Sequence, residues 1–167
     1  MGKTSKEHEE IVQYLENKYK NRGSSSVRDC KLMNVYPKNW EKKWNFKEHP
    51  NRCDYIIAGK KNQRKVIVDV VFNEGWMETL GKVIGYVNEI KNINNTCKVW
   101  LVFNTNGWVK TGKSKILKKF KGNKEKYREY CREWCKILKK ISLSVIDSRF
   151  RSRLKFYDFN GKGLNKL

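Results

Sequence analysis

The chain has 167 residues, with 38 Lys and Arg against 17 Asp and Glu, and its formal net charge is +21. A positive charge of this size favours a polyanionic partner, and nucleic acid is the first candidate. No run of residues approaches the ~20 apolar side chains of a transmembrane helix, and residues 1–6 lack the apolar core of a signal peptide, so we expect no membrane partner and a cytoplasmic protein.

The length suits a single domain over residues 1–167. The first predicted element is a helix that covers residues 5–16. Residues 21–26 predict a flexible turn, and an edge strand is expected within 27–36. The pattern of residues 40–50 does not distinguish a short helix from irregular structure.

The next elements form a predicted hairpin. Residues 52–59 and 65–72 are rich in β-branched and other apolar side chains, and a polar segment separates them. If Lys61 and Asn62 form a two-residue turn, the numbers of paired residues add up to 123. Asp54 then faces Asp69 across the ladder.

Two carboxylates in this position require a compensating interaction. Directly opposed side chains have Cβ atoms about 5 Å apart, where like charges repel. The pair would therefore share a proton or hold a cation, and its hard oxygen atoms suit Mg²⁺ or Mn²⁺. The alternative is a register shifted by one or two residues, in which Asp54 and Asp69 are solvated strand ends.

Residues 76–92 predict an amphipathic helix with two stripes. The first stripe is apolar and is expected to face the core. It consists of Met77, Leu80, Val83, Ile84, Val87 and Ile90. The second stripe places Glu78, Lys82, Tyr86 and Glu89 on one side of the helix.

A strand is predicted over residues 96–104, and turn residues at 104–107 close it. A basic helical segment follows over 110–141. Apolar side chains recur in it at helical spacing and are expected to face inward. They are Tyr127, Tyr130, Cys131, Trp134, Cys135, Leu138 and Ile141.

Lysines near the start of this basic segment are candidates for contact with phosphate groups. They outnumber any local acid, and Gly112 and Gly122 flank them. They are Lys113, Lys115, Lys118, Lys119 and Lys121. The alternative is that these lysines form an ordinary solvated face.

Two further strands are predicted, at residues 142–147 and 154–159, and residues 161–167 are expected to form a frayed tail. Together these elements predict an α/β fold with a mixed central β-sheet flanked by helices.

The order of acid, hairpin turn, acid, loop and helix resembles the restriction-endonuclease-like, or PD-(D/E)XK, nuclease superfamily over roughly residues 5–105. In that family an Asp on the second core strand and an acid on the third bind Mg²⁺, and a helix with Gln-x-x-x-Tyr follows. Asp54 and Asp69 match the two acids, and residues 82–86 match the helix motif with Lys82 in place of Gln. Glu10 matches a Glu that often lies on an N-terminal helix.

The resemblance implies a restriction-endonuclease-like core and a Mg²⁺- or Mn²⁺-dependent nuclease that hydrolyses phosphodiester bonds, with DNA favoured over RNA. Asp54 and Asp69 would hold the metal, Lys82 would stabilise developing charge, and Glu10 would add a ligand or orient water. Tyr86 would contact the nucleic-acid backbone. With only two histidines in the chain, a His-dependent mechanism is not expected.

One residue departs from the family pattern. The family has a Lys two residues after the second acid, and this chain has Val71. Lys82 could supply that charge from the helix, or it could be a solvated lysine paired with Glu78. The alternatives to a nuclease are a catalytically inactive nucleic-acid-binding protein on the same fold and a basic RNA-binding structural protein. Enrichment in Lys and Asn hints at an AT-rich genome such as that of a virus, for which the location would be the host cytoplasm.

Overall fold

The computed structural model describes residues 6–20, 25–31, 52–58, 66–71, 75–92, 98–111 and 118–167. The helices in these ranges are α1 (Lys6–Lys20), α3 (Trp76–Asn92), α4 (Thr105–Thr111), α6 (Lys124–Ser144) and α7 (Ser148–Arg151). The strands are β1 (Ser25–Lys31), β2 (Arg52–Ala58), β3 (Val66–Val71), β4 (Lys98–Phe103), β5 (Leu154–Phe159) and β6 (Leu164–Lys166).

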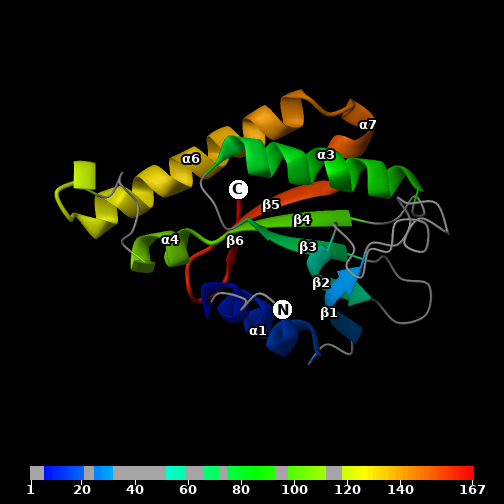
Figure 1. The fold of residues 1–167 in the computed structure, drawn as a ribbon, viewed down its shortest axis with the longest axis horizontal. Helices are drawn as coiled ribbons and strands as arrows, with labels where there is room; N and C mark the ends of the chain where they lie inside the picture. The colour runs from blue at the N-terminus through cyan, green and yellow to red at the C-terminus, as the bar shows by residue number, and fades with distance from the viewer. Residues whose placement is uncertain are drawn as a thin grey trace, which may run out of the picture.

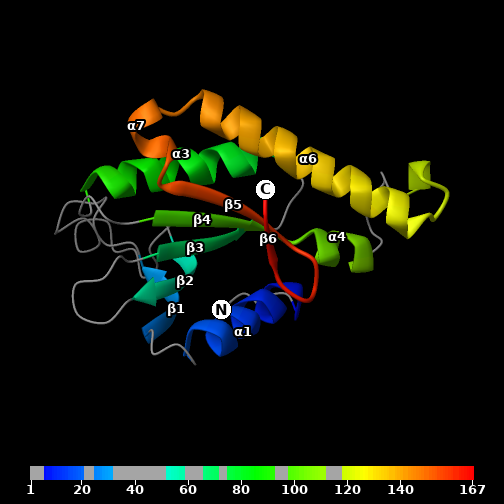
Figure 2. The same cartoon turned by 180° about the vertical axis from the view of Figure 1, so that it is seen from behind.

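The strands form one six-stranded sheet in the order β1-β2-β3-β4-β5-β6. Strands β1, β2 and β3 are antiparallel, β3, β4 and β5 are parallel, and β6 is antiparallel to β5. Helices α3 and α6 cover one face of the sheet and α1 covers the other (Figures 1 and 2). The predicted α/β fold with a mixed central sheet flanked by helices is therefore confirmed.

The predicted register of the hairpin is also confirmed. Tyr55 pairs with Val68, Ile56 with Ile67, and Ile57 with Val66, and the numbers in each pair add up to 123. The hairpin turn itself lies outside the described residues.

Both faces of this hairpin are apolar because each is covered by a helical layer. Ile56, Ile67 and Val71 belong to the core beneath α3 and α6. Tyr55 and Val68 belong to the core beneath α1. The middle of the sheet is thus shielded on both sides, and an acid placed there is buried.

Helix α6 packs on the sheet through the stripe predicted for the basic segment. Tyr127, Cys131, Cys135 and Leu138 are buried, at spacings of four, four and three residues. The helix starts at the N-cap Asn123, whose side chain accepts a hydrogen bond from the backbone N–H of Lys126 at 3.1 Å.

The structure corrects two predictions made for the ends of this helical region. The expected turn at 104–107 is the start of α4, where the Asn104 side chain accepts the N–H of Gly107 at 2.8 Å. The strand expected at 142–147 does not form, because α6 continues to Ser144. Ser142 is buried one turn after Leu138, so the helical period outweighs the β-branched composition of this segment.

The strand predicted at 154–159 is confirmed as β5, whereas the predicted frayed tail is wrong. Leu164–Lys166 pairs with β5 as β6, and the N–H of Leu167 donates to the Phe156 carbonyl at 3.0 Å. Strand β1 covers part of both the turn predicted at 21–26 and the edge strand predicted at 27–36. Residues 32–50 lie outside the described residues.

Among the residues that the structure describes, no helix is both long enough and apolar enough to cross a membrane.

Two neighbouring residues of α6 test the packing. Leu138 is 1% exposed, so Leu138→Ala leaves a cavity and should lower the free energy of unfolding by about 2–5 kcal/mol. Ile137 is 46% exposed, and Ile137→Ala should change it by no more than about 0.5 kcal/mol. Urea unfolding followed by circular dichroism measures both, and equal decreases would contradict this orientation of α6.

Candidate active site around Asp54 and Asp69

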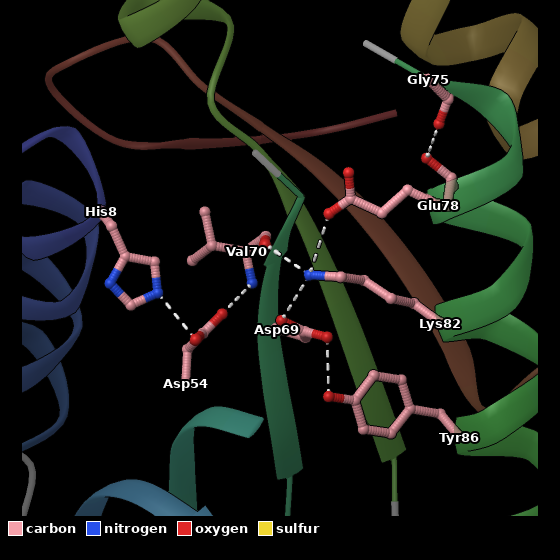
Figure 3. Close-up of polar contacts among 9 residues, drawn as sticks. His8, Asp54, Asp69, Val70, Gly75, Glu78, Lys82 and Tyr86 are labelled. Carbon is pink, nitrogen blue, oxygen red and sulfur yellow. Dashed lines mark hydrogen bonds and ion pairs between the residues drawn. The ribbon is translucent and has the colours of Figure 1, made fainter. Parts of the chain in front are cut away.

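The two predicted acids meet where the β2–β3 ladder ends. Backbone pairing between these strands reaches from Ile57 to Tyr55 and includes neither acid. Next to it, the Asp54 carboxylate accepts a hydrogen bond from the backbone N–H of Val70 at 2.6 Å. The Asp54 side chain is thus the acceptor for a backbone N–H of β3. This hydrogen bond holds Asp54 beside Val70, the residue that follows Asp69 (Figure 3).

Asp69 is 3% exposed and receives two donors from α3. Lys82 Nζ lies 3.1 Å from Asp69 Oδ1, and the Tyr86 hydroxyl donates to Asp69 Oδ2 at 2.7 Å. The Lys82 ammonium also donates to the Val70 carbonyl at 3.0 Å, and it lies 3.7 Å from Glu78 Oε1. Lys82 therefore reaches the acid pair, and it also lies within ion-pair distance of Glu78.

A third element contributes His8. Its Nε2 lies 2.7 Å from Asp54 Oδ1, and it approaches from α1, on the other side of the acids from α3 (Figure 3). Sequence reasoning missed this residue because two histidines were judged too few for a role. No spacing in the sequence indicates this contact, because residues two apart on a helix, such as His8 and Glu10, do not face the same side.

The surroundings shift the pKa values of the two carboxyl groups in opposite directions. Burial, together with the hydrogen bond to Asp54, raises the pKa of Asp69 to about 7, against the attraction of Lys82. Burial also opposes the charge of Asp54, but the hydrogen bonds from His8, Asp69 and Val70 outweigh it, and the pKa of Asp54 lies below its usual value. The pair thus shares a proton near neutral pH, and that proton belongs mainly to Asp69.

The two donors from α3 keep their protons. Burial disfavours the ammonium of Lys82, but the charges of Asp69 and Asp54 prevail and raise its pKa. Burial, with the nearby charge of Asp69, raises the pKa of the Tyr86 hydroxyl. Lys82 therefore remains a cation and Tyr86 remains a hydrogen-bond donor at neutral pH.

This site corrects part of the predicted orientation of α3. Met77 and Ile84, assigned to the apolar stripe, are 65% and 47% exposed. Val83 and Val87 of the same stripe are buried as predicted, and Thr79 and Tyr86 are buried beside them. The helix is rotated so that the edge carrying Lys82 and Tyr86 faces Asp69, because a buried carboxylate needs donors more than Met77 needs burial.

Two other predicted site residues lie in different surroundings. Glu10 forms an ion pair with Lys110 of α4 at 3.1 Å, so the contact of α1 with the acids comes from His8. Tyr86 is only 5% exposed and its hydroxyl is bonded to Asp69, which argues against the predicted contact with a nucleic-acid backbone.

The predicted lysine cluster is described in part. Lys118, Lys119 and Lys121 are exposed before α6, whereas Lys113 and Lys115 lie outside the described residues. The contact of this cluster with phosphate stays a prediction.

The position at which the family has its lysine is a packing position here. Val71 is fully buried in the core beneath α3 and α6, in the same cluster as Phe103 and Trp108. An ammonium on this side chain would lie among apolar groups, whereas the ammonium of Lys82 is already beside Asp69.

The donor set suits a hard cation bound by few protein ligands. Within the described residues, no group of three or more His, Cys, Asp and Glu side chains is arranged to hold a metal. Mg²⁺ is usually held by one or two carboxylates and completes its shell with waters and substrate phosphates. Asp54 and Asp69 together supply that number of carboxylates, and their binding of Mg²⁺ or Mn²⁺ stays a prediction.

Comparisons of this chain with protein-family models, with curated proteins and with solved structures find no match. A functional assignment therefore depends on the geometry and chemistry of the site itself.

The shared proton predicts a pH dependence of stability. The unfolded pKa of Asp69 is about 4 and its folded pKa is about 7, so its contribution to stability is complete below about pH 4 and is lost as the pH rises to about 7. The stability of the unaltered chain relative to Asp69→Asn should fall over this interval, by at most about 1.4 kcal/mol per pH unit. Urea unfolding of both proteins measures this difference, and parallel pH profiles would contradict it.

Proposed function

We propose that this chain is a metal-dependent nuclease that hydrolyses phosphodiester bonds in DNA. The observation that carries the proposal is the convergence of Asp54 and Asp69 from neighbouring strands, with the Lys82 ammonium 3.1 Å from Asp69. The net charge of +21 supports a polyanionic substrate.

The order of the elements supports the resemblance to the restriction-endonuclease-like superfamily. Helix α1 precedes the strands, the acids lie on the second and third strands of the sheet, and α3 follows with Lys82 and Tyr86. The burial of Val71, together with the reach of Lys82, supports the transfer of the family lysine from the third strand to the helix.

In this proposal Asp54 and Asp69 hold Mg²⁺ or Mn²⁺ through their carboxylates. When bound, such an ion lowers the pKa of a water ligand and polarises the scissile phosphate. Its binding requires Asp69 to release its proton, so the affinity for the metal should rise as the pH increases towards neutrality.

The remaining residues act through charge and position. Lys82 supplies a fixed positive charge for the phosphate as negative charge develops on it. The Val70 carbonyl and Asp69 orient this ammonium. Tyr86 positions Asp69, and His8 positions Asp54, each through one hydrogen-bonded contact.

A second candidate function is a catalytically inactive nucleic-acid-binding protein on the same fold. Val71 at the position of the family lysine favours it. In that case the buried acids and Lys82 would be a structural ion-pair network, and cleavage would be absent with every metal tested.

The first test concerns the acid pair. Asp69→Asn should abolish Mg²⁺-dependent cleavage of labelled DNA, while the affinity for DNA in EDTA stays equal or increases because a negative charge has been removed. Calorimetric titration with Mg²⁺ should show binding to the unaltered chain and much weaker binding to the variant. Cleavage at the original rate by a folded Asp69→Asn variant would exclude this site.

The second test concerns the lysine. Removal of one group that stabilises charge in the transition state commonly lowers the rate about 100- to 1000-fold, and Lys82→Ala should lower the cleavage rate by this order. Lys124→Ala removes the same charge from an exposed position at the start of α6 and should leave the rate unchanged. If both variants cleave like the unaltered chain, Lys82 does not have this role.

A further inference from the structure

A second charged site lies on α6, in a groove of about 540 Å³. The groove is formed by the C-terminal half of α6, by α7 and by Leu167, which follows β6. Its lining residues are Lys136, Lys139, Lys140, Leu143, Ser144, Arg151 and Leu167. Four of these seven side chains are cationic and none is acidic, so the groove concentrates positive charge.

Several contacts hold these cations in place. Lys139 Nζ donates to the main-chain oxygen of Leu167, and Arg151 Nε donates to the Ile146 carbonyl at 3.1 Å. Lys136 pairs with Glu133 at 2.7 Å, but both side chains are about 60% exposed, and exposed pairs of this kind are weak. Among the described residues, the Lys140 side chain has no hydrogen bond or ion pair.

Leu167 has a fixed position in the groove. The backbone of Leu167 is tied to β5 by the hydrogen bond to the Phe156 carbonyl, and the Leu167 side chain packs against the core beneath α6. Lys136 and Lys140 are four residues apart and therefore extend from the same side of α6, about 5–6 Å apart at their Cβ atoms. The structure thus presents Lys136 and Lys140 in one line, and the apolar residues Leu143 and Leu167 line the same groove.

This groove is separate from the candidate active site. Helix α7 leads into the start of β5, so this end of the groove lies at the amino-terminal edge of the parallel strands. Asp69 lies in the second half of β3, towards the opposite edge. Figure 1 shows α7 and the end of α6 on the side away from α4, which follows the carboxyl end of β4.

We propose that the α6–α7 groove binds the phosphate backbone of a nucleic acid at a distance from the bond that is cleaved. This inference rests on the proposed function for the identity of the polyanion. Four cationic side chains at this open groove suit the phosphate groups of an extended backbone. A bilayer surface with anionic headgroups is the alternative that the test below distinguishes. Binding here would hold the substrate while the acid pair acts on another part of it.

The double variant Lys136→Gln and Lys140→Gln tests the groove, because glutamine keeps the helix propensity and removes only charge. Binding of a short fluorescent DNA duplex should be measured by anisotropy over a series of salt concentrations in EDTA, where no cleavage occurs. The slope of log K against log salt should become less steep by about 0.9 for each phosphate group that the variant no longer neutralises. The matched control Lys162→Gln and Lys166→Gln removes the same charge from exposed positions outside the groove and should leave the slope unchanged.

The outcomes separate the two proposals. Equal changes of slope in both double variants would mean that the total charge matters and would overturn the groove assignment. If the groove variant instead retains DNA binding but loses binding to vesicles of phosphatidylcholine and phosphatidylserine, the groove is a membrane site. That result would overturn the proposed nucleic-acid site. Absence of cleavage by the unaltered chain would overturn the proposed nuclease, whereas the anisotropy series would still decide whether the groove binds DNA.

Discussion

The structure around the candidate site depends on one constraint, the burial of the Asp69 carboxylate in the middle of a covered sheet. A buried carboxyl group destabilises the fold unless hydrogen-bond donors or a counter-charge reach it. Lys82 and Tyr86 lie one helical turn apart and both reach Asp69, and their approach sets the rotation of α3. The exposure of Met77 and Ile84 follows from that rotation.

Much of the sheet could be predicted from the sequence because its signals are local. Two turn positions were enough to give the register that aligns Tyr55 with Val68, and this register brings Asp54 and Asp69 to the same end of the hairpin. The buried stripe of α6, from Tyr127 to Leu138, was equally readable because it repeats at helical spacing. In both cases the pattern that the sequence shows is also the pattern that the tertiary structure uses.

The errors arose where tertiary contacts override a local pattern. Periodicity alone favours burial of Met77 and Ile84, since it takes no account of a carboxylate that needs donors. The short strand β6 has little strand signal of its own and depends on pairing with β5. The contact of His8 with Asp54 depends on how α1 docks against the sheet, and no spacing along the chain indicates it.

The distribution of the site along the chain has a consequence for biosynthesis. His8, Asp54, Asp69 and Tyr86 are distant in sequence, so their contacts close long loops and form after the local helices and the hairpin. During translation the hairpin leaves the ribosome before α3 does, and Asp69 then lacks both of its donors from that helix. The assembled charge arrangement is thus a property of the completed fold, and a nascent chain that ends before Tyr86 does not possess it.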